Sequence, residues 1–217
     1  FQPGFAKFAD DKPIIIGTTF NELQRLTYNK PMTLDEARTA LQPTFGEDTK
    51  AYIQAFGEAW PSYKPQDLLS IDHLFRPKTI ITADYVSAHR QTPIYMYMFT
   101  WKSPVNQGSV HGHELKFCFN TLHHSANELP SPTAEDQHLA ERMSKSWAQF
   151  AHTGDPNIAD LPTWKPYTAA GGDMMIFDHE CYVRNNPDRK LEEIIDNHCF
   201  QQLKEFNEKK RKEQSSK

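Results

Sequence analysis

Short apolar runs alternate with amphipathic stretches along the chain. Residues 12–23 (KPIIIGTTFNEL) predict a short strand ending at Gly17, because three consecutive isoleucines are typical of a strand covered on both faces. The apolar and aromatic run at 93–101 (PIYMYMFTW) predicts a central strand, and DMMIFD at 173–178 predicts another. Strands separated by helical segments favour an α/β architecture with a mainly parallel sheet.

Helical patterns fill the interval between the first two strands. Thr33 followed by Glu36 predicts a helix start with a capping box. Residues 46–60 (GEDTKAYIQAFGEAW) predict a further amphipathic helix. The segment 76–91 (RPKTIITADYVSAHRQ) places three apolar residues on one face of a helix: Ile81, Tyr85 and Ala88.

The C-terminal part predicts two more helices. Thr133 begins the first, which ends before Gly154 and Pro156 and carries an apolar stripe: Leu139, Met143, Trp147, Phe150 and Ala151. A last helix over 188–207 turns five apolar residues inward: Leu191, Ile194, Ile195, Leu203 and Phe206. The tail at 208–217 is charged. No repeat or linker interrupts the chain, which predicts a single unit over 1–217.

Composition narrows the classes of partner. The chain has 24 basic and 28 acidic residues, for a net charge of −4, so no basic face for nucleic acid is predicted. No run approaches the ~18 apolar residues of a membrane span. Three cysteines, Cys118, Cys181 and Cys199, are too few for a disulfide framework and leave at least one thiol free. That count favours a reducing compartment or a chain without bridges, and the location is left open.

The segment GSVHGHELKFCFN at 108–120 is the strongest candidate for chemistry. His111 and His113 flank a glycine and Glu114 follows, which fits a metal clip, a packing motif or the base of a catalytic triad. The chain has no H-E-x-x-H or C-x-x-C motif and no third ligand at a fixed spacing. We therefore predict no metal site and no cofactor.

Nucleophilic catalysis needs a histidine in a loop after a strand and a carboxylate at the end of an earlier strand. Glu22 lies five residues after Gly17, and His111 lies in the loop after the strand at 93–101. Acid before histidine is also the chain order of α/β-hydrolases, in which the serine comes first. The 217 residues contain no G-x-S-x-G, and the chain begins at Phe1 without a signal segment. Both facts favour a piece of a longer protein, and Glu22 as a solvated surface carboxylate stays open at this point.

Four ordered segments together resemble the C-terminal part of the type-B carboxylesterase family, the cholinesterase-like α/β-hydrolases. IIIGTTFNEL is similar to that family's strand followed by G-x-x-x-D-E-G, with Asn21 in place of Asp and Leu23 in place of Gly. GSVHGHELKFCF resembles its G-x-x-H-G-x-E-[LI]-x-F-x-F. WAQFAHTGDPN resembles W-x-x-F-A-x-T-G-x-P-N, and LPTWKPY resembles P-x-W-P-x-Y with Lys165 in place of Pro.

The resemblance implies the C-terminal portion of an α/β-hydrolase fold that hydrolyses small carboxylic esters through an acyl-enzyme. It assigns the general base to His111 and the triad acid to Glu22. It also implies a companion N-terminal part that carries the nucleophilic serine and the oxyanion donors, so this chain alone should be inactive. Phe117 and Phe119 are expected in the core or, as the alternative, in the wall of an acyl pocket. Trp147 and Phe150 are expected in packing, and His113 at a pocket rim or in packing.

Two alternatives from other classes stay open. Some members of the cholinesterase-like fold lack the serine and act as noncatalytic binding or adhesion modules, and the presence of both Glu22 and His111 argues against that role here. A metal-dependent hydrolase built on His111 and His113 is the other alternative.

Overall fold

The computed structural model describes residues 11–22, 30–70, 75–105, 108–124, 129–195 and 197–198. The chain groups into two compact units, Phe1–Lys30 with Ser70–Asn186, and Pro31–Leu69 with Pro187–Lys217. Each unit is described by itself, and the single unit over 1–217 stays a prediction.

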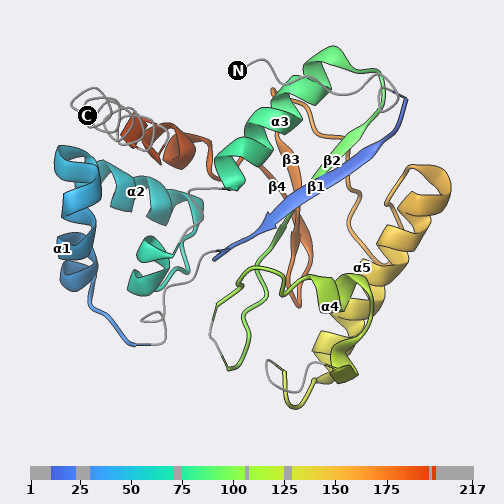
Figure 1. The fold of residues 1–217 in the computed structure, drawn as a ribbon, viewed down its shortest axis with the longest axis horizontal. Helices are drawn as coiled ribbons and strands as arrows, with labels where there is room; N and C mark the ends of the chain where they lie inside the picture. The colour runs from blue at the N-terminus through green and yellow to red at the C-terminus, as the bar shows by residue number, and fades with distance from the viewer. Residues whose placement is uncertain are drawn as a thin grey trace, which may run out of the picture. The chain divides into compact units, whose positions relative to one another are not determined.

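The first unit is built on a four-stranded sheet in the order β1-β2-β3-β4 (Figure 1). The strands are β1 (Ile14–Thr19), β2 (Ile94–Phe99), β3 (Asp173–Phe177) and β4 (Tyr182–Asn185). β1, β2 and β3 run parallel, whereas β3 and β4 pair antiparallel. The predicted α/β class with a mainly parallel sheet is therefore confirmed, and β4 is a strand that the sequence did not predict.

β1 continues two residues beyond the predicted end at Gly17. Gly17 pairs in register with Tyr97 of β2, and a Cβ atom at Gly17 would overlap the Tyr97 ring. The glycine is therefore required for close packing inside the strand, and the strand itself ends at Thr19, three residues before Glu22.

Helices flank the sheet on both sides (Figure 1). α3 (Arg76–His89) contacts β1 and β2 and buries the small side chains of Ala83 and Val86. The predicted face is wrong, because Ile81 is 53% exposed. Small residues let the helix approach the sheet closely, and hydrophobicity alone does not identify such a face.

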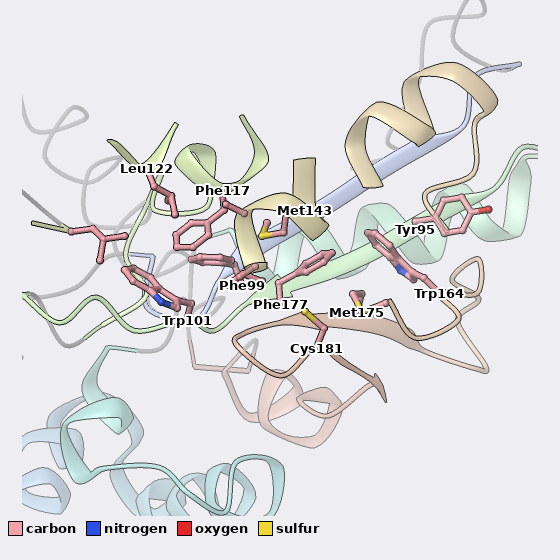
Figure 2. Packing of buried hydrophobic residues seen from close by; sticks show 13 residues of the cluster. Tyr95, Phe99, Trp101, Phe117, Leu122, Met143, Trp164, Met175, Phe177 and Cys181 are labelled. Carbon is pink, nitrogen blue, oxygen red and sulfur yellow. The ribbon is translucent and has the colours of Figure 1, made fainter. Parts of the chain in front are cut away.

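α5 (Ala134–Thr153) packs its apolar stripe against an aromatic cluster on the sheet (Figure 2). Thr133 and Asp136 form its capping box, and Gly154 ends it in the left-handed region at φ 77°. The cluster takes residues from β2, β3, the loops and two helices: Tyr95, Phe99, Trp101, Phe117, Leu122, Leu129, Leu139, Ala140, Met143, Trp164, Met175, Phe177 and Cys181. Trp147 and Phe150 pack against it as predicted, whereas Ala151 is exposed.

Two short helical turns precede α5 in the first unit, α4 (Leu115–Cys118) and the 3₁₀ turn η4 (Leu122–His124). α4 buries Phe117 completely, but Phe119 is 72% exposed, so its predicted place in the core is wrong. The two residues are two positions apart, and in a helical turn such positions face different directions.

The second unit is helical. It contains α1 (Leu34–Phe45), α2 (Thr49–Ala59), and the 3₁₀ turns η2 (Gly46–Asp48) and η3 (Pro65–Leu69). The capping box of Thr33 and Glu36 is confirmed, and Phe45 stacks on Tyr52 with ring centroids 4.1 Å apart. Residues 189–195 are helical and bury Leu191 and Ile195, while Leu203, Phe206 and the tail lie outside the described residues. No helix in the described part of the chain is long and apolar enough to cross a membrane.

Candidate active site

Glu22 and His111 meet just beyond the carboxyl ends of β1 and β2. Glu22 Oε2 and His111 Nδ1 are 2.6 Å apart, and Glu22 Oε1 accepts a hydrogen bond from the Thr19 backbone N–H at 2.8 Å. Glu22 is 7% exposed, whereas the His111 side chain is 70% exposed. A buried carboxylate thus holds one ring nitrogen of an imidazole that is open to solvent.

Backbone hydrogen bonds hold the two loops side by side. The Phe20 N–H donates to the Phe99 carbonyl at 2.9 Å, and the Asn21 N–H donates to the Ser109 carbonyl at 2.8 Å. The His111 N–H then donates to the Glu22 carbonyl at 3.2 Å. The segment after β1 therefore continues to pair with segments that follow β2, and this pairing places Glu22 opposite His111.

Asn21 reinforces this pairing from the side chain. It is fully buried, its Oδ1 accepts from the Ser109 N–H at 3.0 Å, and its Nδ2 donates to Ser70 Oγ at 2.8 Å. An amide can accept and donate at the same time, which suits a residue between these two partners. The departure from Asp at this position thus has a structural use, and the departure at Leu23 lies outside the described residues.

His113 has an environment opposite to that of His111. It is 1% exposed, its Nδ1 accepts from the Val110 N–H at 3.4 Å, and its ring lies edge-on to Trp101 with centroids 6.2 Å apart. Gly112 between the two histidines has φ 80°, a left-handed conformation that glycine adopts without strain. The described residues contain no group of three or more His, Cys, Asp or Glu side chains that could hold a metal ion.

Glu114, the acid that follows the two histidines in the sequence, is half-buried beside this pair. Its Oε2 is buried and has no hydrogen-bond partner among the described residues. Burial raises the pKa of this carboxyl, the charge of Glu22 raises it further, and His111 and a backbone hydrogen bond act in the opposite direction. The sequence signal was the Glu three positions after His111.

The raised pKa of Glu114 predicts a pH-dependent cost to stability. The carboxyl of Glu114 has a higher pKa in the folded than in the unfolded state, so the folded state favours its protonated form. The protein therefore has its full stability below the pKa that this carboxyl has in the unfolded state. It loses stability as the pH rises through the pKa that the carboxyl has in the folded state. Glu114→Gln removes the ionisation. The free energy of unfolding of the variant should therefore increase relative to that of the wild type as the pH rises through the range in which the Glu114 carboxyl ionises.

Urea unfolding of both proteins at a series of pH values measures this difference. Glu141→Gln on the exposed surface of α5 is the matched control, and its difference from the wild type should not follow the same trend. A Glu114→Gln variant that loses stability relative to the wild type as the pH rises would contradict the assignment.

The described cysteines are poor candidates for a nucleophile. Cys118 and Cys181 are free thiols. Burial raises the pKa of Cys118 to about 12, with the charge of Glu114 adding to the effect, and burial also raises the pKa of Cys181. Both are therefore thiols at neutral pH, and the thiol is the unreactive form.

A second acid–histidine contact lies at the start of α5. Asp136 Oδ1 is 2.8 Å from His179 Nε2 and accepts from Trp101 Nε1 at 2.7 Å, while Asp136 Oδ2 accepts from the N–H and the hydroxyl of Thr133. Its hydrogen bonds hold the pKa of the Asp136 carboxyl below its usual value although burial opposes them. This carboxylate caps a helix and ties it to Trp101, so the contact is structural.

Comparisons with solved structures identify the fold. An esterase from Clostridium hathewayi, described as able to hydrolyse aliphatic aromatic polyesters, superposes with a TM-score of 0.76 at 29% identity over 90% of this chain and 39% of that chain. A carboxylesterase of Geobacillus stearothermophilus gives a TM-score of 0.63 at 26% identity over 86% of this chain and 40% of that chain. The fold is that of the α/β-hydrolase esterases, as predicted.

Sequence comparisons give the family. The sequence profile of the carboxylesterase family matches residues 5–194, and this chain belongs to that family. Mouse carboxylesterase 5A is 33% identical over 132 residues, which are 55% of this chain and 22% of the mouse protein. Human cocaine esterase is 28% identical over 183 residues, which are 72% of this chain and 32% of the human protein. The chain therefore spans only about a fifth to two fifths of the length of these relatives.

Proposed function

We propose that this chain supplies the histidine and the acid of a serine carboxylesterase whose serine lies in a part of the protein outside these 217 residues. His111 is the general base and acid, and Glu22 is its partner. The observation that carries the proposal is the 2.6 Å contact between Glu22 Oε2 and His111 Nδ1 on an imidazole that faces solvent. Membership of the carboxylesterase family supports ester hydrolysis as the reaction.

The geometry supports one sequence of proton transfers. Glu22 accepts from Nδ1–H, which leaves Nε2 without a proton and able to take the proton of the serine as its oxygen attacks the ester carbonyl carbon. His111, now an imidazolium paired with Glu22, gives that proton to the alcohol as the ester C–O bond breaks. Water then attacks the acyl-enzyme, with His111 again taking and returning the proton.

The edge of the sheet favours a companion segment. β1 pairs with β2 on one side, and no described strand pairs along its other side. Ile14, Ile15 and Ile16 are only half buried, although three consecutive isoleucines are typical of a strand with both faces covered. An unpaired apolar edge strand also promotes association. We propose that the serine-bearing part of the protein supplies a strand that pairs with β1.

Expression of the chain alone and of the complete protein tests this proposal. The chain alone should hydrolyse a p-nitrophenyl ester no faster than buffer, and a fluorophosphonate probe should not label it. The complete protein should turn over the ester, and mass spectrometry should find the label on a serine outside these 217 residues. A label on a residue of this chain would contradict the proposal, and a complete protein without turnover or label would favour the noncatalytic module instead.

A further inference from the structure

Phe75 lies over the imidazole of His111. The two rings are nearly parallel, with centroids 5.6 Å apart and an interplanar angle of 18°. Phe75 is 39% exposed and is one of the large hydrophobic residues of the described chain that lie at the surface, so core packing does not account for its position. Phe75 is the residue just before α3 and is far in sequence from His111. Nothing in the proton transfers described above requires it.

The position of Phe75 is set by its neighbour in the chain. Arg76 is 1% exposed, and its guanidinium donates to the carbonyl of Phe20 at 3.0 Å and to that of Thr19 at 3.5 Å. The start of α3 is therefore bonded to the same turn that carries Glu22. The turn thus fixes two groups that contact the imidazole, Glu22 at its edge and Phe75 on its face.

We propose that Phe75 is a positioning residue that holds the ring plane of His111. A hydrogen bond at Nδ1 fixes one atom of an exposed ring, and a stacked face fixes the plane in which Nε2 lies. The inference rests on the proposed function, because it is as a base that His111 needs a fixed Nε2. A base that transfers protons in the transition state loses rate when its geometry is loose.

The stack also has an electrostatic consequence. The face of a phenyl ring carries negative charge density and attracts a cation, so it favours the imidazolium over the neutral ring. Among the described residues, Glu22 lies at the edge of the imidazole and the charge of His111 acts on Glu114, while Arg76 and Lys102 lie over the ring of Phe20. Substitution of Phe75 by an uncharged residue leaves all four in place, so a change in the titration of His111 reports the stack.

An NMR titration of the labelled 217-residue chain tests the inference without any turnover. His111→Gln assigns the His111 signals among the ten histidines. Phe75→Leu keeps an apolar side chain but removes the ring, and it should lower the titration midpoint of His111 by about half a unit. Phe75→Tyr keeps the ring and should restore the midpoint, and Ile81→Ala, an exposed residue of α3, should leave it unchanged.

The wild-type chain gives an independent result if a variant fails to fold. Proton–proton Overhauser contacts between the rings of Phe75 and His111 should be present, and their absence would overturn the inference. An unchanged midpoint in folded Phe75→Leu would overturn it as well. In the complete protein Phe75→Leu should lower kcat by up to about 10²-fold and change KM less. Failure of the proposed function would instead appear as turnover that survives His111→Gln, whatever the NMR result.

Discussion

His111→Gln in the complete protein should reduce ester turnover on the order of 10⁶-fold, the loss seen when the base of a serine triad is removed. Glutamine is close to histidine in size and can still donate a hydrogen bond to Glu22 through its amide. It cannot take a proton from a serine hydroxyl at neutral pH. Because the two side chains are close in size and glutamine can keep the hydrogen bond to Glu22, the substitution should cost little stability.

Steady-state kinetics with a p-nitrophenyl ester, corrected for buffer hydrolysis, measures this loss. His152→Gln on the exposed surface of α5 is the matched control and should keep wild-type turnover. His113→Ala tests whether turnover depends on His111 alone or on both histidines of the segment. That ring is buried, so its loss should lower the free energy of unfolding while folded molecules keep their turnover. Equal losses of turnover from His111 and His113 substitutions in folded protein would contradict the assignment.

Sequence patterns predicted the helices and strands whose formation depends on residues close together in the chain. The capping boxes of α1 and α5 involve residues three positions apart, so they can be read from the chain directly. The apolar run of β2 is almost entirely buried, because its edges pair with β1 and β3 while its faces are covered by α3 and the aromatic cluster. β4 has only four residues, two of them polar, lies at an edge of the sheet and shows no alternation of burial. Periodicity therefore carries no signal for it.

The site was only partly predictable for a related reason. Glu22 and His111 could be selected by strand ends, chain order and family resemblance, and their 2.6 Å contact now gives the geometry, while their catalytic roles stay proposals. The contacts that set this geometry join distant residues. Asn21 bonds to Ser109 across 88 positions, and Phe75 stacks on His111. No periodicity encodes such pairs, since they form only when the sheet brings two loops together.

Glu22→Gln should lower kcat of the complete protein by about 10⁴-fold, as replacement of a triad acid by its amide does in serine proteases. In the wild type, Oε2 can only accept, so Nδ1 carries the proton and Nε2 is free to act as a base. Oε1 is held by the Thr19 N–H, which is a donor and requires an oxygen at that position. The amide introduced by Glu22→Gln must therefore place its oxygen toward Thr19 and its NH₂ toward His111. An NH₂ group donates to Nδ1, the ring proton moves to Nε2, and the base becomes a donor where an acceptor is needed.

A shorter carboxylate gives the complementary test. Glu22→Asp keeps the charge but lacks one methylene, so it cannot reach both the Thr19 N–H and His111 Nδ1 from the same backbone position. Its loss of kcat should be clearly smaller than that of Glu22→Gln, because the correct tautomer remains favoured whenever the carboxylate contacts the ring. Glu141→Gln, with its side chain about half exposed, should have no effect. NMR of the ring nitrogens of His111 reads the tautomer directly, and Glu22→Gln with the proton still on Nδ1 would contradict this account of Glu22 even if turnover fell.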